Sequence, residues 1–246
     1  QNTALTVAAN SLSNLTVTNL VGDIVATNLT GTLTVTTADA GDNAISIITG
    51  STTVNLTANA ASNDVITVNA SALAQNTVIT VAATSQSALT VTNLVGDVVA
   101  TNLTGALTVT TGDAGDNGIS ITTGTAATNL TANGTSDVVT VNAAALANGV
   151  ALTVAAASTA GVTVTNLTGD VVASNLSGAL TVTTADNTAD STISVTAGTG
   201  NLTLTAAATT DTVTVNAAAM TTQTITLSGD SNFAVTNWDS TGLLDA

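Results

Sequence analysis

The stretch LTVTNLVGD, residues 15–23, decides the fold because the chain returns to it twice more. It recurs unchanged at residues 89–97 and as VTVTNLTGD at residues 162–170. The step along the chain is therefore 89 − 15 = 74 and then 162 − 89 = 73. Other phrases, such as LTVTTADAGDN, keep the same step. Self-similarity at a fixed step is typical of repeat architectures, in which each unit packs on its neighbours.

Three copies of this repeat account for almost the whole chain. We place them at residues 15–88, 89–161 and 162–232, with a degenerate fourth copy or cap at 233–246, and treat residues 1–246 as one continuous array. The fourth copy reads FAVTNWDSTG and carries the chain's only two aromatic residues, Phe233 and Trp238. We expect these two rings to plug the end of a stacked core.

Each copy contains short segments in which apolar and polar residues alternate. Alternation places the apolar side chains on one face of a strand and the hydroxyls on the other. Gly, Asn and Asp, which favour turns, separate these segments at short and regular intervals. In the first copy the predicted strands are LTVTN (15–19), DIVATN (23–28), TLTVTT (32–37), AISII (44–48), TVNLTAN (53–59), VITVN (65–69) and TVITVAA (77–83).

Two all-β architectures accept this pattern, a string of β-sandwich domains or a parallel β-solenoid. A sandwich must fill about 10 Å between its sheets, usually with aromatic residues, and each copy here has almost none. No Pro or Gly-rich linker separates the copies either. We therefore predict a parallel β-solenoid (β-helix) of roughly 10 to 13 coils, each rising about 4.8 Å. Recurring Thr and Asn residues should then form hydrogen-bonded ladders between coils.

Seven strands per copy is an odd number, which matters if each coil contains two strands. With strict two-strand coils, equivalent strands would change face from one copy to the next. We expect instead that some coils carry three strands or that one of the seven segments is a loop.

The composition excludes several classes of function. The chain has no Lys, Arg or His, and its 15 acidic residues give a formal net charge of −15. Nucleic acid is excluded as a partner because nothing can displace counterions from phosphates. Cys is absent, so disulfides and thiolate metal sites are excluded as well. No apolar run approaches the roughly 20 residues that a membrane-spanning helix needs.

Phrases such as LTVTNLVGD, VVATNLTGALTVTTGDAGDN and DVVTVNAAAL resemble the β-strand-repeat regions of very large bacterial exoproteins. These are surface-layer and adhesin-like proteins associated with repeats-in-toxin modules. The resemblance covers essentially the whole chain and implies an extracellular, bacterial cell-surface location more than an activity. The calcium-binding nonapeptide GGxGxDxxx of that family is not present in this sequence, so calcium does not follow from the resemblance.

Aspartates recur at equivalent positions of the copies, and the DAGDN loop at 39–43 combines two carboxylates, an amide and a glycine. Ca²⁺ prefers six to eight oxygen ligands, and such loops can supply several of them. The alternative is that each Asp caps its own turn without a metal. Both interpretations remain open. The candidate Ca²⁺ ligands are Asp39, Asp42, Asn43, Asp113, Asp116, Asn117, Asp186, Asp190, Asp23, Asp97 and Asp170.

Catalysis is not expected, because the carboxylate pairs repeat in every copy and no other residue type could serve as a base. We predict a self-assembling structural subunit of a surface layer, sheath or filament, which grows by adding copies to its open strand edges. The alternatives are an adhesin stalk, or a module that binds ice or carbohydrate through its Thr and Asn faces. For ice binding, we expect the T-x-T pairs to form an interrupted array, since they occur at two places per copy.

Overall fold

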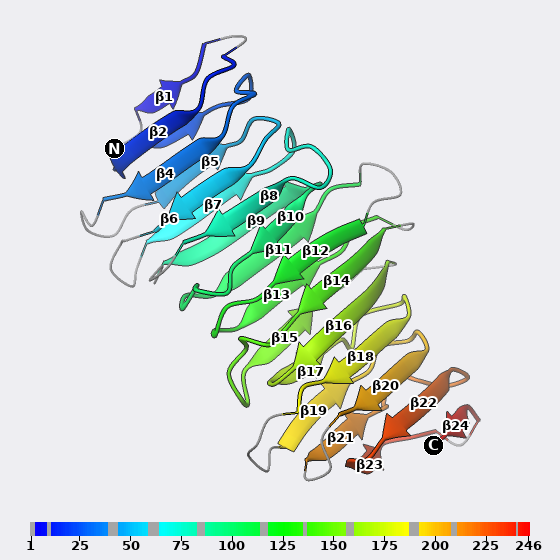
Figure 1. The fold of residues 1–246 in the computed structure, drawn as a ribbon. Coiled ribbons are helices and arrows are strands. Elements are labelled where there is room, and N and C mark those ends of the chain that lie inside the picture. Colours follow the sequence, from blue (N-terminus) through cyan, green and yellow to red (C-terminus); the bar gives the residue numbers. More distant parts are fainter. Residues whose placement is uncertain are drawn as a thin grey trace.

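The chain folds into a rod of stacked coils, seen in a computed structural model (Figure 1). The structure describes residues 3–8, 11–38, 44–58, 64–82, 87–113, 118–134, 137–155, 160–186, 192–207, 211–239 and 241–246. These residues form 24 strands and no helix. The two ends of the chain lie at opposite ends of the rod.

The strands form two parallel sheets of twelve strands each, and the chain alternates between them. One sheet contains the odd-numbered strands in order: β1 (Ala4–Thr6), β3 (Asp23–Val25), β5 (Ala44–Ile48), β7 (Val65–Asn69), β9 (Ala88–Leu94), β11 (Leu107–Thr111), β13 (Thr128–Thr131), β15 (Ala151–Val154), β17 (Asp170–Val172), β19 (Thr192–Thr196), β21 (Thr212–Asn216) and β23 (Asn232–Thr236).

The other sheet contains the even-numbered strands, and each coil therefore contributes one strand to either sheet. They follow in order: β2 (Leu15–Leu20), β4 (Leu33–Thr37), β6 (Val54–Thr57), β8 (Val78–Val81), β10 (Asp97–Val99), β12 (Gly118–Thr122), β14 (Val138–Asn142), β16 (Gly161–Leu167), β18 (Leu180–Thr184), β20 (Leu202–Ala206), β22 (Thr224–Gly229) and β24 (Leu243–Asp245). The predicted parallel β-solenoid is confirmed.

The structural repeat is a single coil and not the longer unit that recurs in the sequence. Leu15 and Val162 begin equivalent phrases, and the fourteen strands β2 to β15 between them make seven coils, so one coil averages about 21 positions, (162 − 15)/7. One sequence copy is thus three and a half coils. Individual coils vary because their loops vary. The paired Leu15 and Leu33 are 33 − 15 = 18 positions apart, whereas the paired Val54 and Ile79 are 79 − 54 = 25 apart.

Successive copies therefore present equivalent strands on opposite sheets. The phrase that begins at Leu15 forms β2 in the even sheet, its second copy forms β9 in the odd sheet, and its third forms β16 in the even sheet again. Both explanations that we expected for the odd strand number, three-strand coils or a missing strand, are wrong. All seven predicted segments of the first copy are strands, and every coil has two.

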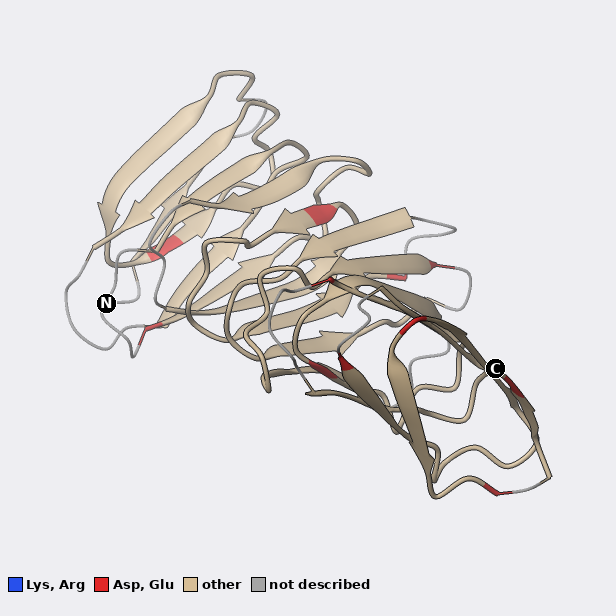
Figure 2. Cartoon of the chain, turned by 60° about the horizontal axis from the view of Figure 1, so that its bottom comes forward, with Lys and Arg blue, Asp and Glu red and all other residues tan. Residues whose placement is uncertain are grey.

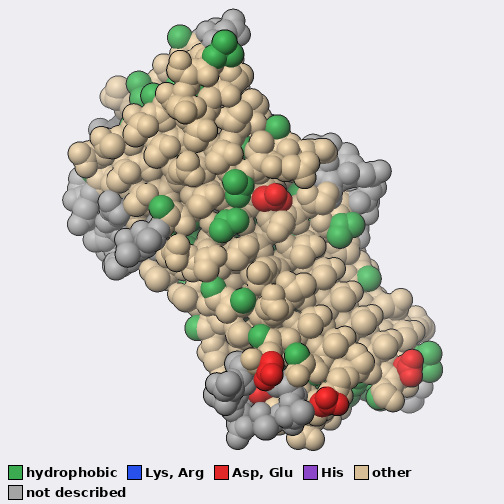
Figure 3. Space-filling model, in the orientation of Figure 1, with side chains coloured by type: hydrophobic (Ala, Val, Ile, Leu, Met, Phe, Trp, Pro, Cys, Tyr) green, Lys and Arg blue, Asp and Glu red, His purple; other side chains and the backbone are tan. Residues whose placement is uncertain are grey.

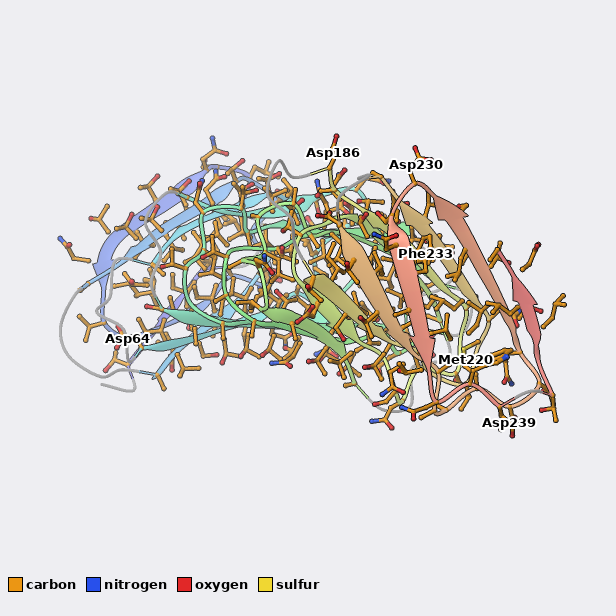
Figure 4. The ribbon with its side chains drawn as sticks, turned by 90° about the horizontal axis from the view of Figure 1, so that it is seen from below. Asp64, Asp186, Met220, Asp230, Phe233 and Asp239 are labelled. Atoms are coloured by element: carbon orange, nitrogen blue, oxygen red, sulfur yellow. The ribbon has the colours of Figure 1, made fainter. Side chains whose placement is uncertain are left out.

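The core is a narrow layer of aliphatic side chains between the two sheets. Strands such as β4 alternate buried apolar and half-buried hydroxyl residues, as Leu33, Val35 and Thr34 show. Aromatic rings are needed only at the C-terminal coil, where Phe233 and Trp238 pack, partly buried, against the core. Figure 4 shows Phe233 on the last strand of its sheet.

Glycines in the NLxGD phrase allow adjacent coils to approach each other. A Cβ atom on Gly96 would lie 2.3 Å from the carbonyl oxygen of Thr77, and one on Gly169 would lie 2.3 Å from that of Val150. The next residue, Asp97 or Asp170, donates its N–H to that same carbonyl oxygen. Only glycine leaves room for this backbone contact.

Candidate functional site

The aspartate of each NLxGD phrase is the first residue of a short strand, β3, β10 or β17. Its carboxylate accepts a hydrogen bond from a backbone N–H in the following coil of the same sheet. The Oδ1 atoms of Asp23, Asp97 and Asp170 lie 2.8 Å from the amide nitrogens of Ser46, Ser120 and Ser194, respectively. A carboxylate that accepts a backbone N–H stabilises the junction between two coils without a cation.

These three aspartates do not form a shared site. Asp23 and Asp170 lie in the odd sheet, seven strands apart, and Asp97 lies in the even sheet. Two copies of the repeat separate Asp23 from Asp170 along one sheet, and the half-coil offset between successive copies places Asp97 on the other. Figure 2 accordingly shows acidic residues distributed along the rod.

Most of the predicted ligands in the DAGDN loops lie outside the described residues: Asp39, Asp42, Asn43, Asp116, Asn117 and Asp190. The two described members, Asp113 and Asp186, are exposed. Figure 4 shows Asp186 at the rim of the rod, pointing away from the core. Within the described part of the chain, no three acidic side chains come close enough to hold one metal ion.

In each copy, the strand that begins with the NLxGD aspartate pairs with the strand that follows the second Asp-rich sequence. Residues 39–43 lead directly into β5, and β5 pairs with β3, whose first residue is Asp23. The same relation holds between β10 and β12 and between β17 and β19. The aspartate of the NLxGD phrase therefore lies on the strand beside the one that follows the second Asp-rich sequence of its copy. The Ca²⁺ assignment itself stays a prediction.

A further column of aspartates is buried, which the sequence did not indicate. Asp64, Asp137 and Asp211 each immediately precede a strand and are at most 3% exposed. The Asp137 carboxylate packs against the Cα of Gly134, where an added Cβ would lie 2.1 Å from its Oδ2. The position before a strand, after an Asn- or Ala-rich loop, was visible in the sequence, but its burial was not.

The predicted ladder of polar side chains is present, but it joins different positions of the repeat. In the VNA phrases, the Oδ1 of Asn69, Asn142 or Asn216 accepts a backbone N–H two residues later, at 3.1 to 3.2 Å. The same Oδ1 atoms also accept a hydrogen bond from an asparagine of the next coil. The donors are the side-chain amides of Asn93, Asn166 and Asn237, at 3.5, 3.4 and 3.0 Å.

The outward faces of the sheets carry longer hydroxyl arrays than expected. On six consecutive strands of the even sheet, β12 to β22, every strand presents two outward polar residues. The first of the two is in register on all six strands, whereas the register of the second shifts at a bulge between β16 and β18. We call this set the hydroxyl block. Its first column is Ser120, Thr140, Thr163, Thr181, Thr203 and Thr226, and its second is Thr122, Asn142, Thr165, Thr183, Thr205 and Ser228.

The expected interruption of the hydroxyl array occurs at one strand in every seven of a sheet. It does not occur between each coil and the next. Strands with S-x-T, T-x-N and T-x-S pairs fill the places between the T-x-T strands. The interrupting strand is the one that begins with the NLxGD aspartate: β10, with Asp97 and Val99 outward, precedes the block. An equivalent block on the odd sheet has the column Ser46, Thr67, Thr90, Thr108, Asn129 and Thr153.

The two sheets present extended outer faces. No pocket opens among the described residues. A search for helices able to cross a bilayer finds none in the described part of the chain. No protein-family model matches the chain, and searches of curated proteins and of solved structures also find no match.

Proposed function

We propose that the protein is an extracellular structural element, a self-assembling subunit of a bacterial surface layer, sheath or filament. The observation that carries the proposal is the unbroken pair of sheets: twelve strands follow one another in each sheet through all three copies. Such a rod has extended faces and no pocket among the described residues, which suits mechanical support more than chemistry.

Self-association is supported by the strands at the ends of the sheets. β1 and β23 end one sheet, and β2 and β24 end the other, so each presents one edge of backbone donors and acceptors. An unpaired edge of this kind can accept a further coil from a second copy. Addition of this type is heterologous and generates an open fibre.

Stabilisation by Ca²⁺ is part of the proposal. Fifteen carboxylates and no cationic side chain make the rod self-repelling, and divalent cations relieve such repulsion. An ion at the corner formed by β3 and β5, and at its two equivalents, is proposed because β3 begins with Asp23 and pairs with β5, the strand that follows residues 39–43 in the sequence. Adding one ion would then join adjacent coils.

Electron microscopy of the purified protein tests assembly and its metal dependence together. We expect ordered filaments or lattices in about 5 mM Ca²⁺, a concentration that saturates weak extracellular sites, and their loss after excess chelator. Isolated rods in both conditions would rule out self-assembly and leave a spacer, such as an adhesin stalk, as the better account.

Two variants separate the metal from the hydrogen bond. Asp97→Asn keeps an oxygen acceptor for the Ser120 N–H but removes a charge, whereas Asp97→Ala removes both. We expect Asp97→Asn to lose Ca²⁺-dependent stabilisation while keeping the midpoint of thermal unfolding measured in chelator. Asp97→Ala should lower that midpoint in chelator as well. Equal Ca²⁺-dependent stabilisation in Asp97→Asn and the unmodified chain would contradict an ion at this corner.

A further inference from the structure

The hydroxyl block combines a first column in continuous register with a second column that shifts once, at the bulge between β16 and β18. Neighbouring strands of a sheet lie about 4.8 Å apart, and residues two positions apart along a strand are separated by about 6.6 Å. The first column is in direct register from Ser120 on β12 to Thr226 on β22. Six rows therefore extend over roughly 24 Å at the strand spacing, with every position of the first column occupied by a hydroxyl.

The block is also uncharged, although the chain as a whole is strongly acidic. Its twelve side chains are all exposed or half-buried, and none is an aspartate. Figure 3 shows mainly uncharged polar side chains and backbone over β14 to β20. Only a few of the hydroxyls are engaged with the protein: Thr165 donates to the carbonyl of Val141, and Thr205 pairs with Ser228.

The strands beneath the block hold these groups at fixed positions. Each block strand has buried aliphatic residues on its inner face, such as Val162 and Val164 on β16 and Leu202 and Leu204 on β20. Threonine is branched at Cβ and has few rotamers, so little side-chain entropy is lost when it binds a surface. The array is thus preorganised.

A ligand that engages all six rows at once must itself be periodic in two directions. A soluble sugar usually requires a pocket or an aromatic platform, and the two aromatic residues lie in the C-terminal coil. If the block bound the same face of a second copy, hydrogen bonds from its hydroxyls to water would be replaced by hydrogen bonds between hydroxyls. Such a contact would form no ion pair and would bury little apolar surface.

We propose that the hydroxyl block binds the surface of ice. Oxygen atoms on the prism faces of hexagonal ice repeat at spacings close to those between the rows and between the columns of the block. Threonine methyl groups order the adjoining water, and the hydroxyls join that ordered layer to the lattice. Ice is electrically neutral, which fits a part of this acidic rod's even sheet that spans six strands without a carboxylate.

The proposal is tested by measuring how strongly the full chain inhibits ice recrystallisation. The assay is run at a concentration at which sedimentation velocity shows that the protein is monomeric. Thr181→Tyr places a bulky ring at the centre of the even block, and Thr108→Tyr does the same at the equivalent position of the odd block. We expect Thr181→Tyr to raise the inhibitory concentration several-fold. The effect of Thr108→Tyr should be smaller, because Asn129 and Ile48 already interrupt the odd array. The double variant should lose at least tenfold.

Thr222→Tyr is the matched control, since Thr222 is exposed in a turn and lies on neither sheet face. It should inhibit like the unmodified chain, and all variants should share its far-ultraviolet circular dichroism and melting temperature. The proposal is overturned if the monomeric chain inhibits no better than an equal concentration of an inert protein, or if Thr181→Tyr behaves like Thr222→Tyr. Inhibition that appears only in assembled protein would also overturn it. Because the assay uses the monomer, failure of this proposal and failure of the filament proposal are distinguishable.

Discussion

Four asparagines of the repeated VTN phrase adopt the left-handed backbone conformation that glycine usually occupies. Asn19, Asn93, Asn166 and Asn237 have φ angles between 53° and 55°. In the first three copies they lie at a shift in strand register, which is the geometry of a β-bulge. Asparagine tolerates this conformation better than other non-glycine residues, and its amide also reaches the VNA asparagine of the neighbouring coil. The sequence predicts a turn-forming residue here and ladders of asparagines between coils, but not which two asparagines of the repeat pair.

A pair of glycine substitutions separates close coil contact from simple chain flexibility. Gly96→Ala should lower stability by about 1–3 kcal/mol, the usual cost of overpacking, because its Cβ would lie 2.3 Å from the Thr77 carbonyl oxygen. Gly118→Ala should be neutral or raise stability by about 0.5 kcal/mol, since nothing lies within 4 Å of its added Cβ. Urea unfolding followed by circular dichroism measures both. Equal effects of the two changes would show that the coil contact at Gly96 is unimportant.

At the level of the strand, alternation alone was sufficient to find the elements. All seven predicted segments of the first copy are strands, because each has one apolar face that must be buried. Their ends were less predictable. The strand in the segment predicted at 23–28 ends at Val25, because the chain then turns. The N–H of Leu29 donates a hydrogen bond to the carbonyl oxygen of Ala26, with 2.8 Å between nitrogen and oxygen. This hydrogen bond closes a local turn, and the alternation of apolar and polar residues, which continues to Ala26, does not mark where that turn begins.

Exchanging similar side chains on β16 tests how strictly the two faces differ. Val164 is fully buried, and Val164→Thr should cost about 1–3 kcal/mol because it places a hydroxyl in the aliphatic core. The reverse change on the outer face, Thr163→Val, keeps the shape and branching and should shift stability by less than about 0.5 kcal/mol. Thermal unfolding of the two variants provides the comparison. A similar loss in both would mean that the outer hydroxyls contribute to the fold as much as the core does.

At the scale of the whole molecule, the sheet in which each copy places its strands depends on whether a copy contains an odd or an even number of strands. The sequence predicts seven strands per copy, and two strands per coil then follow only if alternate copies change sheets. Either sheet can accept any copy because the two layers of the core have the same aliphatic composition. The candidate metal ligands were harder to place, since that parity puts Asp97 on the opposite sheet from Asp23 and Asp170. The hydroxyl block depends on register between six different segments of the repeat and was also not predictable from one strand.

Deleting one sequence copy makes the exchange of sheets measurable. Removing residues 89–161 joins Ala88 to Val162, so the VTVTNL phrase of the third copy should replace β9 beside β7. We expect the shortened chain to fold, because its new junction repeats a native one and each coil contacts only its neighbours. In the full chain Thr80 on β8 pairs with Val99 on β10. In the shortened chain Thr80 should pair with Val172, which the full chain holds on the odd sheet.

Disulfide formation reports this pairing without interference because the chain contains no cysteine. Thr80→Cys with Val172→Cys should cross-link on oxidation in the shortened protein, where adjacent strands place the Cα atoms about 5 Å apart, within the range of a disulfide. The same pair should stay reduced within the monomeric full chain, in which Thr80→Cys with Val99→Cys is the positive control. A shortened chain that folds but fails to cross-link 80 to 172 would show that copies keep a fixed sheet. That result would contradict the half-coil offset between copies. The same offset places one hydroxyl array on the even sheet and the other on the odd sheet.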